Sequence, residues 1–124
     1  NKPQQKDAVI EDCQVWLAQN YDISSPIGEV IKVSGLSSRS FVRRFKKATG
    51  TTPIHYVMNL RIEEAKQVLE MTAEPIEAVA EIVGYKDSSF FNRKFQDKVG
   101  LTPAQYRKKF FRHRGFEPLP IVEG

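Results

Sequence analysis

The sequence predicts an all-α fold in which one helical unit is used twice. Residues 35–56 return, in similar form, as residues 84–106. Apolar residues recur at the three- and four-residue spacing of helices, and no segment shows a convincing strand alternation. Proline and glycine punctuate both copies at equivalent places, and such a self-similarity indicates a duplicated supersecondary unit. The shared positions are Pro26/Pro75, Ile27/Ile76, Val30/Val79, Gly35/Gly84, Ser38/Ser88, Phe41/Phe91, Arg43/Arg93, Phe45/Phe95, Gly50/Gly100, Thr52/Thr102, Pro53/Pro103 and Tyr56/Tyr106.

Local start and stop residues place the helices of the first copy. Asp7 is expected to cap a helix reaching Asn20, whose apolar side includes Cys13 and Trp16 as core residues. Ser25-Pro26 opens a short helix, because proline fits the first helical position, and Gly35 ends it. Ser37 then caps a third helix that reaches Ala48.

The same markers continue through the second copy. Thr52-Pro53 starts a long helix to about Met71, and the next helix runs from Pro75 to Val83. Asp87 caps a helix from Ser88 to Lys98, and Thr102-Pro103 opens the last one. The buried side of the long helix is expected to carry Ile54, Met58, Ile62, Ala65 and Leu69.

Composition excludes several classes of protein. The 124 residues suit one domain or two small lobes, and no apolar run approaches the ~20 residues of a membrane span. The single cysteine cannot form an internal disulfide, and neither histidine has a second ligand or base at useful spacing. We therefore expect no metal, no cofactor and no catalytic residues. Asn1 is not a start residue, so a fragment is expected.

Basic charge is clustered although the net charge is only +4. Residues 37–50 contain five basic residues and no acid, and residues 104–114 contain five more, again without an acid. Such clusters are what a polyanionic partner requires, but most charge runs are simply solvated faces. The charge pattern is therefore compatible with nucleic acid and does not establish it.

Each copy reads as a short helix, a glycine-containing turn and a second helix, which is the helix-turn-helix plan. If the two phenylalanines of each second helix are buried, equivalent outward faces remain, without an acidic residue. Arginine can bond guanine, and asparagine or glutamine adenine, in the major groove. Two ordinary amphipathic helices remain the alternative. The outward faces are Arg39, Val42, Arg43 and Lys46 in the first copy and Ser89, Asn92, Arg93 and Gln96 in the second.

Three runs of residues resemble the DNA-binding domain of the AraC/XylS family of bacterial transcription regulators, over about residues 5–110. They are G-L-S-x(4)-V-R-R-F-K-K-x-x-G-x-x-P-x-x-Y, R-I-E-E-A-K-Q-V-L, and A-x-x-V-G-Y-x-D-x-S-x-F-x-R-x-F with the following G-x-T-P-x-x-Y-R. The resemblance implies seven helices in two homeodomain-like helix-turn-helix subdomains joined by a long linker helix. The implied domain spans residues 1–114, with a first lobe at 5–51, the linker helix at 53–71, a second lobe at 74–110 and a tail at 115–124. The first copy departs from the family pattern in having Ile31 where the second has the usual small Ala80.

The resemblance also implies roles for individual residues. Arg43 and Arg93 occupy a family arginine for which a phosphate contact or support of the helix is the alternative to base reading. The implied base-facing residues are Arg39, Val42, Arg43, Ser88, Ser89, Asn92 and Arg93. The implied DNA-backbone contacts are Ser38, Lys46, Lys47, Gln96 and Arg107.

The predicted function is sequence-specific binding of a double-stranded DNA operator by a cytoplasmic, nucleoid-associated regulator. Two recognition helices would read successive major-groove segments. The expected partners are RNA polymerase in the full regulator and a missing N-terminal effector or dimerisation domain, with no membrane and no enzymatic activity. Three alternatives stay open: a self-sufficient monomeric regulator, a DNA-repair methyl acceptor, which the lack of a multi-cysteine site opposes, and a module that binds an acidic protein.

Overall fold

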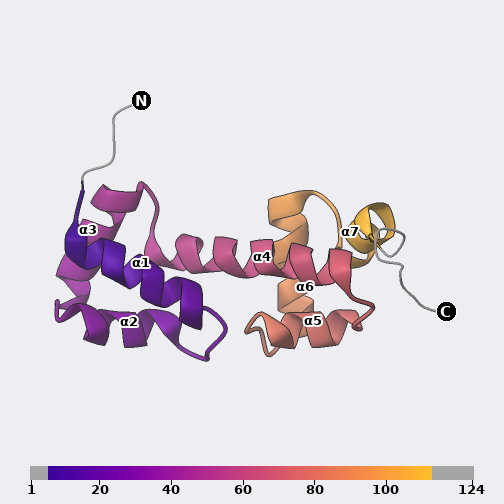
Figure 1. The fold of residues 1–124 in the computed structure, drawn as a ribbon, viewed down its shortest axis with the longest axis horizontal. Helices are drawn as coiled ribbons and strands as arrows, with labels where there is room; N and C mark the ends of the chain where they lie inside the picture. Colours follow the sequence, from indigo (N-terminus) through magenta and orange to yellow (C-terminus); the bar gives the residue numbers. More distant parts are fainter. Residues whose placement is uncertain (1–5, 113–124) are drawn as a thin grey trace. The chain divides into compact units, whose positions relative to one another are not determined.

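The structure, a computed structural model, describes residues 6–112, and within them every regular element is an α-helix (Figure 1). This confirms the predicted all-α class and its seven helices over the described residues. The fifth helix is shorter than expected, and the third and sixth each extend one residue further. The predicted tail at 115–124 lies outside the described residues. The helices are α1 (Ala8–Asn20), α2 (Pro26–Ser34), α3 (Ser38–Thr49), α4 (Pro53–Met71), α5 (Ile76–Ile82), α6 (Ser88–Val99) and α7 (Pro103–Phe110).

The chain divides into two compact units, one ending at Arg61 and the other beginning at Ile62, so their boundary falls inside α4. In the first unit, α1, α2 and α3 pack on one another, and α2 and α3 form a helix-turn-helix pair. In the second unit, α5 and α6 form the equivalent pair and α7 packs on α6. The turn within each helix-turn-helix pair contains a glycine with positive φ, a conformation that glycine adopts without strain. These glycines are Gly35 at +73° and Gly84 at +104°. No described helix is long and apolar enough to cross a membrane.

The predicted caps hold the helix starts. The Asp7 carboxylate accepts from the backbone N–H groups of Val9 and Ile10 at the start of α1. Asp87 does the same for α6, and Ser37 accepts from a backbone N–H of α3. Thr102 goes beyond the prediction, because it forms a reciprocal capping box with Gln105. Pro26 opens α2 as predicted, but the Ser25 side chain makes no capping bond.

The core of the first unit is apolar and is built from residues of α1, α2, α3 and α4. Phe41 and Phe45 are fully buried, with ring centroids 5.4 Å apart. Cys13 is buried with them, as predicted, and burial raises the pKa of its thiol. Trp16 is only partly buried and packs against the edge of this cluster. The buried residues of the cluster are Ile10, Cys13, Leu17, Val30, Phe41, Phe45 and Val57.

The second unit repeats this arrangement of aromatic rings. Phe91 and Phe95 are fully buried on α6, and the Tyr106 ring meets Phe95 edge-on at 5.5 Å. In the first unit, the Tyr56 ring meets Phe45 edge-on at 5.1 Å. The duplication seen in the sequence is therefore a duplication of packing.

The buried residues of α4 correct one expectation. Ile54 was placed on a continuous apolar side, but its side chain is 69% exposed, and Val57 is buried instead at 5%. Ile62, Ala65 and Leu69 are buried as expected. The five-residue step from Val57 to Ile62 breaks the three- and four-residue spacing, because α4 contributes to one core before Arg61 and to another after it.

The hydroxyls of the two equivalent tyrosines have different partners. The Tyr56 hydroxyl accepts from the Gln14 amide at 3.2 Å. The Tyr106 hydroxyl donates to the Glu70 carboxylate, whose other oxygen pairs with Arg112 at 3.0 Å. Burial, and then the hydrogen bond and negative charge of Glu70, raise the pKa of Tyr106 to about 12.

We predict that Tyr106→Phe lowers the free energy of unfolding by about 1.5–3 kcal/mol, the usual contribution of a hydrogen bond to a charged group. A pKa raised on folding stabilises the protein fully below the unfolded pKa of about 10, and the contribution disappears as the pH rises through 12. Urea unfolding at pH 8 checks the energy, and tyrosine absorbance titration checks the component near pH 12. Tyr56→Phe, which loses a neutral bond, is the matched control at about 0.5–1.5 kcal/mol. Equal losses in the two variants would contradict this assignment.

Candidate nucleic-acid interface

The burial of Phe41 and Phe45 fixes which side of α3 faces solvent. These residues are one turn apart, so the opposite side of the helix is exposed along its length. Arg39 and Val42 lie on the exposed side, and the Val42 side chain is 43% exposed. The structure thus exposes the four residues predicted on this face, Arg39, Val42, Arg43 and Lys46. It also exposes Ser38 and Lys47, which were predicted as DNA-backbone contacts.

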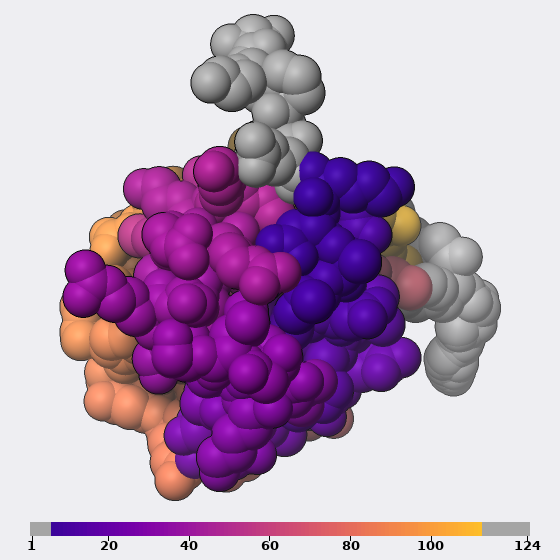
Figure 2. Space-filling view, turned by 90° about the vertical axis from the view of Figure 1, so that its left-hand side faces the viewer, coloured from indigo at the N-terminus to yellow at the C-terminus, as the bar shows by residue number. Residues whose placement is uncertain are grey.

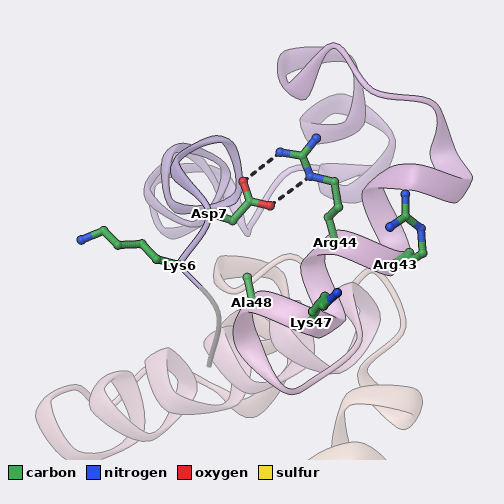
Figure 3. A pocket seen from close by; sticks show the side chains of 6 residues that line it. All are labelled: Lys6, Asp7, Arg43, Arg44, Lys47 and Ala48. Carbon is green, nitrogen blue, oxygen red and sulfur yellow. Dashed lines mark hydrogen bonds and ion pairs between the residues drawn. The ribbon is translucent and has the colours of Figure 1, made fainter. Parts of the chain in front are cut away.

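Arg44 is the basic residue of α3 that is not free for an external partner. Its guanidinium donates Nε–H and Nη2–H to the two oxygens of Asp7, at 3.0 and 2.9 Å (Figure 3). The hydrogen bonds from Arg44 hold the pKa of the Asp7 carboxyl below its ordinary value, against the opposing effect of burial. Asp7 therefore caps α1 and also ties its first turn to α3. Figure 2 shows this side of the first unit, with α1 in indigo and α3 in purple next to each other.

The equivalent face of α6 is polar but less basic. Ser89, Arg93 and Gln96 are exposed, whereas Ser88 and Asn92 are half-buried. The Asn92 amide nitrogen donates to the backbone carbonyl of Ser88 at 2.7 Å. This bond uses one of the two amide N–H groups, so the other N–H and the amide oxygen of Asn92 remain for a paired contact to adenine.

Phe90 adds an aromatic surface beside the α6 face. Its side chain is 38% exposed, and its ring lies 5.7 Å from that of Tyr85. The Arg93 guanidinium and the Lys94 ammonium lie over the Phe90 ring, at 5.6 and 5.3 Å from its centroid. The Phe90 ring therefore packs on Tyr85 and also contacts two cations.

Arg107 was predicted to contact the DNA backbone, but its guanidinium is engaged inside the second unit. Nε–H donates to the Leu69 carbonyl at 3.1 Å, and Nη1–H donates to the Glu74 carbonyl at 2.6 Å. Nη2 is buried without a hydrogen-bond partner. Both carbonyls lie at the C-terminal end of α4 or just beyond it. This geometry favours a structural role for Arg107, and its contact with the DNA backbone stays a prediction.

Two of the side-chain contacts described above join residues that are far apart in the sequence, and the sequence alone does not predict them. Asp7 and Arg44 are 37 positions apart, and Arg107 and Leu69 are 38 apart. Neither pair has a spacing that identifies it along one helix. The exposed faces, in contrast, follow from helical periodicity, which is why they were found.

The structure contains two helix-turn-helix pairs, and in each pair one face of the second helix is exposed to solvent. This geometry defines the class of helix-turn-helix proteins. A family model described as "Helix-turn-helix domain" matches residues 31–109. The chain belongs to this family, and specifically to the AraC type that its sequence resembles.

Similar proteins agree with this assignment. The MmsAB operon regulatory protein of Pseudomonas aeruginosa is 42% identical over 74 residues, which are 60% of this chain and 24% of that protein. The C-terminal domain of AraT, a response regulator from Geobacillus stearothermophilus, superposes with a TM-score of 0.82 at 25% identity, over 86% of this chain and 88% of that one. The DNA-binding domain of AdpA, solved in complex with a target DNA, shares the fold with a TM-score of 0.78 at 22% identity, over 90% and 97% of the two chains. The chain spans about a quarter to a third of the length of the first curated relatives it matches.

We predict that Arg107→Met lowers the free energy of unfolding by about 1–3 kcal/mol, because it leaves the carbonyls at the end of α4 without their donors. Urea unfolding measures the loss. Lys108→Met, at the next and exposed position of α7, is the control and should stay within about 0.5 kcal/mol of the wild type. An Arg107→Met protein as stable as the control would return Arg107 to the list of surface cations.

Proposed function

We propose that the chain is the sequence-specific, double-stranded-DNA-binding part of a bacterial transcription regulator. The observation that carries the proposal is the repeated exposed face: α3 and α6 each bury a phenylalanine pair and leave a face without acids. Basic and amide side chains on such a face match the phosphates and base edges of a major groove. Family membership and a relative that is named an operon regulatory protein support the same function.

Two classes of contact are assigned to the exposed residues. Arg39 is suited to paired hydrogen bonds with guanine, and Val42 to contact with a thymine methyl group. Lys46 and Lys47 near the end of α3 suit phosphates, which position the protein without reading sequence. Ser38 of the first unit is also assigned to the DNA backbone. In the second unit, Ser88, Ser89, Asn92 and Arg93 are assigned to bases and Gln96 to the DNA backbone.

The two units differ in charge, and this difference assigns them different shares of the binding energy. Arg39 and Lys46 of α3 are replaced by Ser89 and Gln96 at the equivalent places of α6. Phosphate attraction dominates affinity, whereas neutral polar groups contribute mainly selectivity. We therefore assign most of the affinity to the first unit and a larger part of the discrimination to the second.

In this proposal the two recognition helices read successive major-groove segments, about one helical turn (~34 Å) apart. The matched relatives are longer than the part that this chain covers. The proposal gives the full regulator an effector-binding or dimerisation domain and places it on the N-terminal side. RNA polymerase is the proposed partner of the full regulator, which would act in the cytoplasm at the nucleoid. The role is binding, with no catalysis.

We predict that Arg39→Ala changes the sequence preference, whereas Lys46→Ala lowers the affinity for all sequences. Both residues are exposed on α3. Sequences selected from a random duplex pool define the preferred site, and anisotropy titrations at several salt concentrations give affinity and salt slope. Arg39→Ala should lose about 1–3 kcal/mol on that site and accept other bases at one position. Lys46→Ala should bind all sequences more weakly alike and reduce the salt slope by about 1.

Each variant serves as the control for the other, because both remove one positive charge from the same helix. A relaxed preference in Lys46→Ala with none in Arg39→Ala would exchange their roles. A wild-type protein that selects no sequence and whose duplex binding barely changes with salt would overturn the proposal and favour an acidic protein partner.

A further inference from the structure

A basic hollow lies at the junction of α3 with the segment that precedes α1 (Figure 3). It belongs to the first unit and lies beside the exposed face of α3. Cations of both elements line it, together with one carboxylate. The lining residues are Lys6, Asp7, Arg43, Arg44, Lys47 and Ala48.

The carboxylate does not oppose an anion in this hollow. Asp7 accepts two backbone N–H bonds from α1 and a bidentate pair from Arg44, so both of its oxygens are occupied. Arg44 in turn is neutralised by Asp7 and held in place by it. The pair joins the two elements, as Figure 3 shows, and is here called the floor of the hollow.

Three cations around this floor remain uncompensated. Lys6, Arg43 and Lys47 are exposed, and none of the ion pairs found within residues 6–112 includes them. In Figure 3 Lys6 and Arg43 extend to opposite sides of the Asp7–Arg44 pair. Arg43 and Lys47 are four residues apart, so they share one side of α3. A tetrahedral phosphate group accepts several charge-assisted hydrogen bonds. In this hollow it would take them from Arg43 and Lys47 on α3, and from Lys6 once that exposed side chain turns toward the Asp7–Arg44 pair.

We propose that this hollow, here called the Lys6–Lys47 hollow, binds a backbone phosphate of the DNA whose bases face α3. The inference rests on the proposed function and deepens it in two ways. It assigns Arg43 to a phosphate instead of a base, and it makes Lys6, before α1, part of the interface. A helix in the major groove has a phosphate backbone along each flank, and this hollow lies on one flank of α3.

Duplexes in which a single phosphate is replaced by a neutral methylphosphonate test the inference. The preferred duplex is scanned one position at a time with the wild type, Lys6→Ala, Lys47→Ala and the control Lys66→Ala. Lys66 pairs with Glu63 on α4, outside the hollow, and its substitution also removes one positive charge. Circular dichroism verifies that the variants, which change exposed or non-core side chains, keep the fold.

For the wild type, neutralising the phosphate that occupies the hollow should weaken binding up to about tenfold at 0.1 M salt, the contribution of one phosphate contact. Lys6→Ala and Lys47→Ala should both lose sensitivity at that same position and keep it elsewhere. Lys66→Ala should retain the wild-type profile. This joint loss at one position is not expected of two lysines that contact separate phosphates.

The negative outcomes separate the two proposals. A wild type that binds no duplex overturns the proposed function and this inference together. Duplex binding with unchanged profiles in Lys6→Ala and Lys47→Ala overturns the inference alone. Titration with inorganic phosphate, followed by backbone amide shifts of Arg43 and Lys47, tests the other source. Saturation by free phosphate with unchanged duplex profiles would make the hollow a site for a free anion and would also overturn the DNA assignment.

Discussion

The burial of two phenylalanines one turn apart controls what each second helix can do. Phe41 with Phe45 on α3, and Phe91 with Phe95 on α6, are excluded from solvent. Such a pair fixes the rotation of a helix about its own axis, because turning it would expose both rings and lose several kcal/mol of burial. The packing of the core therefore determines which residues of the helix face solvent. A change in the exposed set alters recognition without altering the fold, and this is where the two copies differ.

The contacts around these aromatic cores are partly repeated between the two units. In each unit a tyrosine from the following helix meets the second phenylalanine edge-on, so Tyr56 and Tyr106 close equivalent cores. The hydrogen bonds and ion pairs that join the helices differ between the units. The first unit uses Asp7 with Arg44, and the second uses Glu70 with Tyr106 and Arg112. Because the Asp7–Arg44 ion pair lies beside the exposed face of α3, it also lines the Lys6–Lys47 hollow. The second ties α7 and Arg112, two residues beyond it, to the end of α4.

Local chemistry was predictable from the sequence, and non-local pairing was not. The caps at Asp7 and Asp87 were found because a capping carboxylate bonds backbone groups two or three residues away. The exposed faces followed from periodicity. Ile54 is exposed although regular periodicity predicts it to be buried, because the buried positions of α4 change spacing between Val57 and Ile62. The partners of Arg44 and Arg107 lie more than 30 residues away, and a single sequence gives no distance between such residues.

The central claim is that the exposed faces of α3 and α6 are the surface that binds DNA. Amide chemical-shift mapping with the preferred duplex tests it most directly, since it follows all backbone N–H groups in one experiment. The account predicts that the largest shifts fall on residues 38–47 and 88–96 and that the acidic residues of α5, Glu77 and Glu81, are unaffected. Shifts centred on α5 or on the outer side of α1, with α3 and α6 unchanged, would contradict it.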